Sequence, residues 1–348
     1  MPSRRGASPV AEPLRIVAIG GGTGLSTLLH GLKHYMHCGP DQTENRYDID
    51  ITAVVTVTDD GGSSGRLRRD FDVLPPGDIR NCLVAMSEDE ALLGRLFQYR
   101  FSGGKGLKGH TLGNLFLTAL THLTGDFANA VQHASDVLAT CGRIYPSTRT
   151  NVSLEATLAD GTKVDGETRI SKSRERIKRV RLKPAVCKPL PETLRAIAEA
   201  DLITLGPGSL FTSVIPNLLV RGMADAIQDS PAIKAYFVNL MWQPGETIQF
   251  CASDHVRAIY EHAGKKVIDV AIINTKKIPA PLKRKYAAQQ AMPVENDTGR
   301  LAAMGVKVVA RELAAEGEKV RHNPEKLAET AVHLAGEGRR KRLRAKRK

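Results

Sequence analysis

Three glycine-rich loops hold most of the residues in this sequence that could bind a phosphate-bearing ligand. Glycine has no Cβ, so the N–H groups of such loops can approach an anion closely, and a following helix adds the positive end of its dipole. Threonine and serine hydroxyls in the loops add further donors. The residues that we expect to contact a diphosphate are Gly21, Gly22, Thr23 and Gly24 in the first loop, Ser63, Ser64 and Arg66 in the second, and Gly206, Gly208, Ser209 and Thr212 in the third.

Two carboxylates, Asp59 and Asp60, directly precede the second loop. A carboxylate at the end of a second strand often accepts a ribose hydroxyl, and two adjacent carboxylates could hold a magnesium ion on a phosphate. The alternative is a pair of turn residues that cap their own backbone. The adjacent GGSSGR segment favours the ligand-binding interpretation.

Two further segments enter helices through rigid or glycine-containing turns. The first is PPGDIRN at 75–81 and the second is GHTLGN at 109–114. Polar side chains at such helix entries can reach a ligand bound nearby. We therefore add Asn81, His110 and Asn114 to the predicted binding residues.

Three known loop chemistries fit these loops poorly. A dinucleotide fingerprint requires a third glycine where this chain has Leu25, and a P-loop requires a lysine that is absent. Gly61 to Gly65 matches the G-x-S-x-G nucleophile elbow, but Asp59 and Asp60 replace its apolar lead-in. A purely structural role, in which glycine serves packing in strand–helix turns, also remains open for each loop.

The loops follow apolar, β-branched segments, so strands must position them. Strands are expected at 14–19, 51–58, 201–205, 234–239 and 267–273. Helices are expected at 25–36, 79–86, 89–99, 111–123, 127–140, 191–199, 216–228 and 253–263. This alternation predicts an α/β fold, a Rossmann-like three-layer sandwich with a mostly parallel sheet and its ligand at the carboxyl ends of the strands.

Residues 150–183 interrupt this alternation of strands and helices. Alternating segments at 151–158, 162–170 and 177–182 predict a small antiparallel β-meander inserted into the body. The expected organisation is a disordered arm at 1–13, a single domain at 14–330 and a disordered basic tail at 331–348.

The net charge of +13 is concentrated in two segments. Residues 339–348 carry eight basic groups and no acid, and residues 169–183 carry eight basic groups and one acid. The rest of the chain is close to neutral, which argues against a basic nucleic-acid-binding surface. We expect the tail to be an independent solvated arm that contacts RNA, anionic lipid or an acidic partner.

The expected location is a reducing cytoplasm. No apolar run approaches the ~20 residues of a membrane span, and no signal-peptide core precedes Pro13. The five cysteines form no CxxC pair, which argues against a disulfide framework and a zinc site.

Longer motifs resemble one family. GGGTGLSTLLHGLK, ITAVVTVTDDGGSSGRLR, PPGDIRN, KGHTLGN, LTGDFANAV, GPGSLFTSVIPNLLV and SDHVRAI occur in the order typical of the gluconeogenesis factor family (YvcK-type). The resemblance covers about residues 14–330. This family is related to 2-phospho-L-lactate transferase (CofD), which joins a phospholactyl nucleotide to a deazaflavin with magnesium.

The resemblance implies a cytoplasmic protein that binds UDP-sugars, notably UDP-N-acetylglucosamine, and that supports cell shape and wall synthesis during gluconeogenic growth. By similarity, Tyr286 and Arg321 contact the base or the sugar. No catalytic activity is established for the family, so we expect a non-catalytic regulator that requires no cofactor, with magnesium as an optional ion. Its expected partners are an enzyme of carbon or amino-sugar metabolism and a second copy of the chain, weakly held. The alternative is a phospho- or nucleotidyl-transferase.

Overall fold

A computed structural model describes residues 12–36, 48–88, 92–173 and 175–346. The body is an α/β sandwich built on a seven-stranded sheet in the order β10-β9-β8-β7-β1-β2-β3, in which every neighbouring pair is parallel. This confirms the predicted fold class. The strands are β1 (Leu14–Gly20), β2 (Ile49–Val55), β3 (Arg143–Pro146), β7 (Leu202–Leu205), β8 (Ile233–Phe237), β9 (Val270–Asn274) and β10 (Lys307–Arg311).

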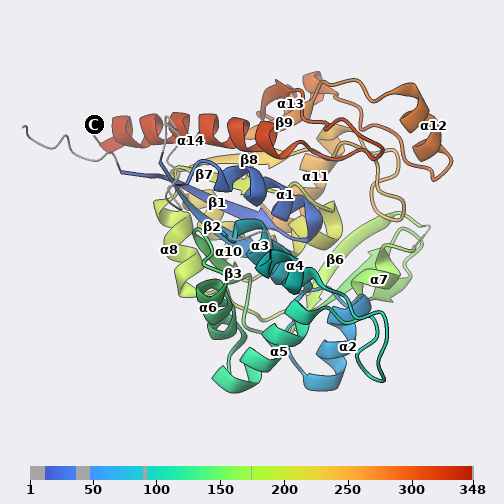
Figure 1. The fold of residues 1–348 in the computed structure, drawn as a ribbon. Helices are drawn as coiled ribbons and strands as arrows, with labels where there is room; N and C mark the ends of the chain where they lie inside the picture. The colour runs from blue at the N-terminus through green and yellow to red at the C-terminus, as the bar shows by residue number, and fades with distance from the viewer. Residues whose placement is uncertain (1–11, 37–47, 89–91, 174, 347–348) are drawn as a thin grey trace, which may run out of the picture.

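Helices cover both faces of the sheet, which explains why its central strands are almost wholly apolar (Figure 1). The helices before the insertion are α1 (Gly22–Lys33), α2 (Gly62–Phe71), α3 (Gly77–Met86), α4 (Leu93–Gln98), α5 (Leu112–Thr124) and α6 (Phe127–Val137). After it come α8 (Pro191–Glu199), the π-helix η1 (Leu210–Val214), α9 (Ile215–Leu218), α10 (Met223–Asp229), α11 (Ala252–Ala263), α12 (Ala280–Ala287), α13 (Thr298–Ala303) and α14 (Pro324–Lys346).

The strand order creates a switch point beside β1. The chain passes from β1 to β2 and β3 on one side, and later enters β7 on the other side of β1. The loops that follow β1 and β7 therefore diverge at the carboxyl end of the sheet. Open α/β sheets bind their ligands in the crevice at such a point.

The inserted meander is shorter than predicted. β4 (Ser153–Leu158) pairs antiparallel with β5 (Lys163–Asp165) and β6 (Ile177–Lys183). The expected strand at 162–170 is wrong beyond Asp165, because Gly166 has a φ of +92° and turns the chain into the short helix α7 (Glu167–Ile170).

The prediction of a disordered tail is also wrong. Residues 331–346 belong to the long helix α14, which packs on α1, β1 and β7 and runs along the top of the molecule in Figure 1. Its apolar face is buried, and the basic residues at its end include two that pair with Asp201, a fully buried carboxylate. The buried apolar face of α14 and the distant carboxylate of Asp201 thus order residues 331–346, although their composition predicts a solvated segment. Most of the predicted N-terminal arm lies outside the described residues.

No single helix of the described chain is long and apolar enough to cross a membrane. Two helical segments, Leu210–Leu218 and Met223–Asp229, are long and apolar enough only when taken together, and the chain bends by 77° between them.

The described cysteines are of two kinds. Cys82, Cys187 and Cys251 have free, buried thiols, whereas Cys141 is disulfide-bonded. The argument from cysteine spacing against disulfides is therefore wrong for Cys141, because separation along the chain does not determine distance in the fold.

Candidate functional site

A cleft of about 440 Å³ lies at the carboxyl ends of β1, β7 and β8. It is lined by the loops that follow these three strands and by residues 320–322, the segment before α14. Three carboxylates, from the end of β2, from α3 and from α7, complete it. The lining residues are Gly21, Gly22, Thr23, Gly24, Thr27, Asp59, Asp78, Glu167, Pro207, Gly208, Ser209, Ser213, Asn239, Leu240, Met241, Gln243, Val320, Arg321 and His322.

Close backbone packing shapes the floor of the cleft. A Cβ on Gly24 would lie 2.3 Å from the carbonyl oxygen of Pro207 and 2.9 Å from the Cα of Gly208. Backbone atoms cannot yield to such contacts without moving the whole loop. Only glycine therefore lets the first turn of α1 approach the loop after β7.

The first turn of α1 offers hydrogen-bond donors to the cleft. The N–H groups of Thr23 and Gly24 have no acceptor within their own helix. The N–H of Gly22 is already engaged, because it donates to Oδ2 of Asp78 at 2.7 Å. The helix thus presents a partial positive charge to the cleft through fewer N–H groups than the sequence suggests.

The carboxylates of the cleft are partly buried and repel one another. Burial raises the pKa of Asp78 to about 6, and the charge of Asp59 adds to this, whereas the Gly22 N–H and Arg80 act in the opposite direction. Burial also raises the pKa of Glu167 well above its ordinary value, with smaller contributions from neighbouring acids, first of all Asp59 and Asp78. The site therefore combines donors for an anion with acids that can hold a proton near neutral pH.

Asp59 and Asp60 have different roles. Asp59 lines the cleft, and its Oδ1 also accepts the Gly61 N–H at 2.8 Å, as a turn cap would. Asp60 lies outside the cleft, where its Oδ1 accepts the N–H and the hydroxyl of Thr168 at 2.8 and 2.6 Å. The two carboxylates therefore do not form the predicted joint magnesium site. Asp60 instead attaches α7 to the body, which brings Glu167 to the cleft.

A metal centre is not evident from geometry alone. Among the residues described, no group of three or more histidine, cysteine, aspartate or glutamate side chains is arranged to hold a metal ion. Asp59, Asp78 and Glu167 are the acids that an ion bound with a phosphate ligand would meet in the cleft.

Arg321 supplies the only lysine or arginine charge among the described lining residues. Its neighbour His322 is neutral at physiological pH, since burial lowers its pKa to about 4. Tyr286 does not line the cleft, and its hydroxyl accepts the Val320 N–H at 3.2 Å. Tyr286 thus positions the wall segment that carries Arg321.

The GGSSG segment does not line the cleft. Ser63 Oγ lies 3.0 Å from Nδ1 of His110 and accepts the amide N–H of Asn114 at 3.0 Å, and all three side chains are buried. Ser63 is absent from the lining of the cleft, so this serine–histidine pair does not form the nucleophile of an elbow there. Arg66 donates to the carbonyl oxygen of Lys108 at 2.9 Å.

Eight of the predicted residues meet in the cleft: Gly21, Gly22, Thr23, Gly24, Asp59, Gly208, Ser209 and Arg321. The others do not line it: Asp60, Ser63, Ser64, Arg66, Asn81, His110, Asn114, Gly206, Thr212 and Tyr286. The arrangement narrows the predicted site to the loops after β1 and β7, one carboxylate and one arginine.

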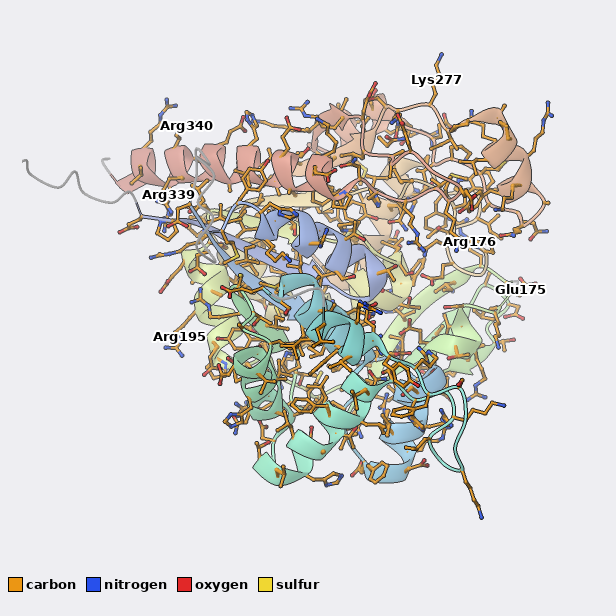
Figure 2. All side chains as sticks on the ribbon, in the orientation of Figure 1. Glu175, Arg176, Arg195, Lys277, Arg339 and Arg340 are labelled. Atoms are coloured by element: carbon orange, nitrogen blue, oxygen red, sulfur yellow. The ribbon has the colours of Figure 1, made fainter. Side chains whose placement is uncertain are left out.

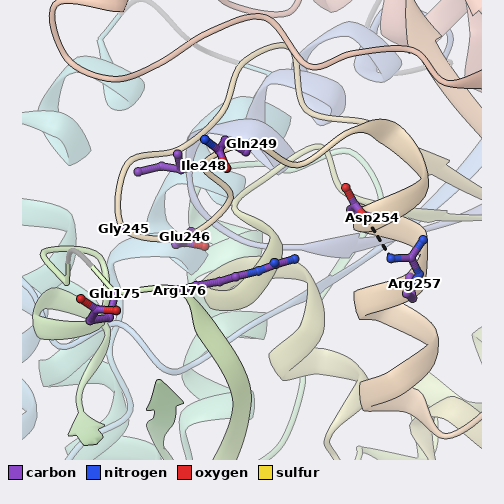
Figure 3. Close-up of a pocket in the computed structure, with 8 residues that line it drawn as sticks. All are labelled: Glu175, Arg176, Gly245, Glu246, Ile248, Gln249, Asp254 and Arg257. Atoms are coloured by element: carbon purple, nitrogen blue, oxygen red, sulfur yellow. Dashed lines mark hydrogen bonds and ion pairs between the residues drawn. The ribbon is translucent and has the colours of Figure 1, made fainter. Parts of the chain in front are cut away.

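Thr212 belongs to the surroundings of a different cavity. Its hydroxyl donates to the buried carboxylate of Glu246 at 3.3 Å, which also accepts the N–H of Phe211. Figure 3 shows the second cavity, which Glu246 helps to line together with Arg176 and the ion pair of Asp254 and Arg257. Its charges are of both signs, so it offers no clear preference for an anion or a cation.

Sequence reasoning missed several cleft residues. Asp78 lies within the PPGDIRN motif, but only Asn81 of that motif is among the predicted binding residues; Asp78 stands in the first turn of α3, whose N-cap is Pro76. Glu167 lies within the strand expected at 162–170, and no local sequence signal marks it as a cleft residue. Asn239, Gln243 and Ser213 are ordinary polar residues whose role depends on the fold.

Comparisons with known proteins agree on one family. The family model described as 2-phospho-L-lactate transferase CofD matches residues 16–314. The gluconeogenesis factor of Bacillus subtilis (strain 168) is 47% identical over 324 residues, which cover 93% of this chain and 98% of that protein. The gluconeogenesis factor of Halalkalibacterium halodurans is 48% identical over 318 residues, covering 91% and 95% of the two chains. A crystal structure of a protein from Bacillus halodurans is similar to the chain with a TM-score of 0.87 at 46% identity, covering 92% of this chain and all of that one.

Proposed function

Because the chain belongs to the gluconeogenesis factor family and carries a CofD-like domain, we propose that its cleft binds a UDP-sugar, UDP-N-acetylglucosamine. In this proposal the protein is a cytoplasmic regulator that reports the level of the nucleotide sugar to an enzyme of carbon or amino-sugar metabolism. It thereby balances wall precursors and cell shape during gluconeogenic growth. The chain acts without catalysis, as a weakly held homo-oligomer.

The proposal depends most on the α1 N-terminus and Arg321 lining the same cleft. A diphosphate placed between them receives the first-turn N–H groups of Thr23 and Gly24 from one side and a guanidinium from the other. Asp59 lies in the loop that follows β2, at the edge of the sheet where a ribose hydroxyl is commonly bound. Magnesium would offset the charge of the acids around the diphosphate.

Calorimetry with the full chain tests the ligand. We expect UDP-N-acetylglucosamine to bind and NAD to bind far more weakly, because Leu25 interrupts the dinucleotide fingerprint.

Arg321→Gln should weaken UDP-N-acetylglucosamine binding at least tenfold, about 1.4 kcal/mol, through loss of the cleft's guanidinium. Arg257→Gln, on α11 beside the second cavity, is the matched control. Tight NAD binding, or an Arg321→Gln variant with normal affinity, would contradict the assignment.

The pH dependence of binding tests the role of Asp78. Its folded-state pKa of about 6 exceeds the ordinary value of 3.8, so the ionised form is destabilised in the fold and predominates only above pH 6. Without magnesium, lowering the pH from 7.5 to 5.5 neutralises Asp78 and should tighten UDP-N-acetylglucosamine binding by roughly threefold or more, since one like-charge contact costs about 1 kcal/mol or more here. In the Asp78→Asn variant, the affinity for UDP-N-acetylglucosamine should lose most of its dependence on pH between 7.5 and 5.5. An unchanged slope in that variant would assign the effect to other groups.

The second candidate is a transferase, favoured by the CofD match and by two cleft acids with raised pKa values, Asp78 and Glu167. A transferase must also hold an acceptor and release a product. Product analysis after incubation with UDP-N-acetylglucosamine and magnesium distinguishes the two functions. Turnover that Glu167→Gln abolishes would establish catalysis and replace the regulatory proposal.

A further inference from the structure

A third cavity, of about 630 Å³, adjoins the cleft. It shares Thr23, Thr27 and Arg321 with the cleft. Its other walls come from α1, α3, α4, the segment between α4 and α5, and the first residue of α14. The remaining lining residues are Ser26, His30, Arg80, Asn81, Val84, Ala85, Gly94, Arg95, Gln98, Arg100, Thr111 and Pro324.

Four arginines face this cavity without a compensating acid. They are Arg80, Arg95, Arg100 and Arg321, and no aspartate or glutamate is among the described residues that line it. Within the part of the chain that the structure describes, none of the four forms an ion pair with a carboxylate. The cavity therefore has a strongly positive lining, in contrast to the acid-rich cleft beside it.

Arg80 is held in place by neutral partners. Its Nη1 donates to the Thr111 hydroxyl at 2.7 Å and to the amide oxygen of Asn114 at 2.9 Å, and its Nη2 donates to the amide oxygen of Asn81 at 2.7 Å. Its Nε is buried without a partner. These contacts orient the guanidinium without pairing it directly to a carboxylate, so a bound anion would add a charge partner that the described contacts lack.

Neighbouring charges strengthen this interpretation. Burial lowers the pKa of Arg80, the nearby Arg100 lowers it further, and Asp78 and Asp59 on the cleft side counteract the two effects. Arg100 itself donates to the carbonyl oxygen of Gly109 at 2.6 Å, which is again a neutral partner. Guanidinium groups match phosphate oxygens in geometry and charge better than any other side chain.

We propose that this arginine-lined cavity binds a second ligand, a small phosphate-bearing anion that is distinct from the nucleotide sugar. The phosphate group binds between Arg80, Arg95 and Arg100, with Thr111 beside it. The volume exceeds that of a phosphate ion, so a phosphate monoester of a small metabolite fits the cavity. Because Arg321 and Thr23 line both spaces, occupancy of one site alters the charge environment of the other.

Titration with inorganic phosphate tests the proposal without using the nucleotide sugar. Calorimetry at constant ionic strength should show one phosphate site on the full-length chain. The double variant Arg95→Gln/Arg100→Gln, which changes residues outside the cleft lining, should weaken phosphate binding at least tenfold and keep the thermal unfolding midpoint. Arg195→Gln is the matched control, because this arginine lies on α8, away from the cavity, with its side chain 73% exposed (Figure 2).

A second titration, with UDP-N-acetylglucosamine at saturation, separates the two sites. Phosphate should still bind under these conditions, and the double variant should keep its nucleotide-sugar affinity within about threefold. The proposal is overturned if phosphate does not bind, if the double variant binds it normally, or if the nucleotide sugar displaces it completely. Equal losses of phosphate and nucleotide-sugar affinity would also overturn it, since the cavity would then be part of the cleft. Failure of UDP-N-acetylglucosamine to bind would instead contradict the proposed function and leave the first titration as the test.

Discussion

Replacing Asp201 by alanine is expected to lower the free energy of unfolding by about 3 kcal/mol. Asp201 is fully buried and accepts the Arg15 N–H at 3.0 Å, three contacts of 2.7 to 2.9 Å from Arg339, and Nη2 of Arg342 at 3.0 Å. Alanine would leave both guanidinium groups, which are only 15% and 13% exposed, without their anion. Urea unfolding followed by circular dichroism measures the change.

Glu199→Ala is the matched control for this experiment. Its carboxylate pairs with Arg15 at 3.5 Å but is 60% exposed, so its removal should cost less than about 1 kcal/mol. Equal stabilities of the Asp201→Ala and Glu199→Ala variants would show that the buried cluster does not hold α14 in place.

Truncation of the chain provides an independent test of the same cluster. A chain that ends at Gly338 loses both arginines and should be destabilised nearly as much as Asp201→Ala, whereas a chain that ends at Arg342 keeps them and should retain most of its stability. An independent basic arm predicts instead that both truncations are equally stable.

Gly24→Val is expected to weaken UDP-N-acetylglucosamine binding at least a hundredfold, about 2.7 kcal/mol. The new Cβ would lie 2.3 Å from the Pro207 carbonyl oxygen and 2.6 Å from its carbon, so α1 and the loop after β7 must separate. Separation moves the N–H groups of Thr23 and Gly24 away from the diphosphate. Calorimetry measures the affinity, and circular dichroism checks the fold.

Two further variants control for misfolding. Gly22→Ala adds a methyl group whose nearest neighbour is Ser213 Oγ at 3.7 Å, so the main cost is the φ of +61°, roughly 1 kcal/mol. This variant should fold and still bind at least tenfold more weakly, because its methyl group enters the cleft. Gly299→Ala, on α13 with no atom within 4 Å of the added Cβ, should behave like the unmodified chain. Normal binding by a folded Gly24→Val chain would assign the first loop a packing role alone.

Local sequence patterns were sufficient for the fold class and for part of the site. Apolar, β-branched runs such as residues 14–19 predict buried strands, because both faces of a parallel sheet are covered. The β1, β7 and β8 strands lie close to their predicted ranges. The prediction that the first and third glycine loops meet at the same edge of the sheet also holds, since Gly24 contacts the backbone of Pro207 and Gly208.

Contacts between distant segments decided the rest. Asp78 reaches the Gly22 N–H across 56 residues, and Asp60 reaches Thr168 across 108, which brings Glu167 to the cleft. Arg339 pairs with Asp201 across 138 residues and so helps to order the end of α14, a segment that composition alone predicts to be disordered. Glycine placement and hydrophobic period are properties of a short stretch of chain, so the sequence by itself determined the elements and the loops that follow them. The partner of a carboxylate or a guanidinium depends on distances in space, and only the tertiary structure decided which acids enter the cleft, which one supports it and which one anchors the last helix.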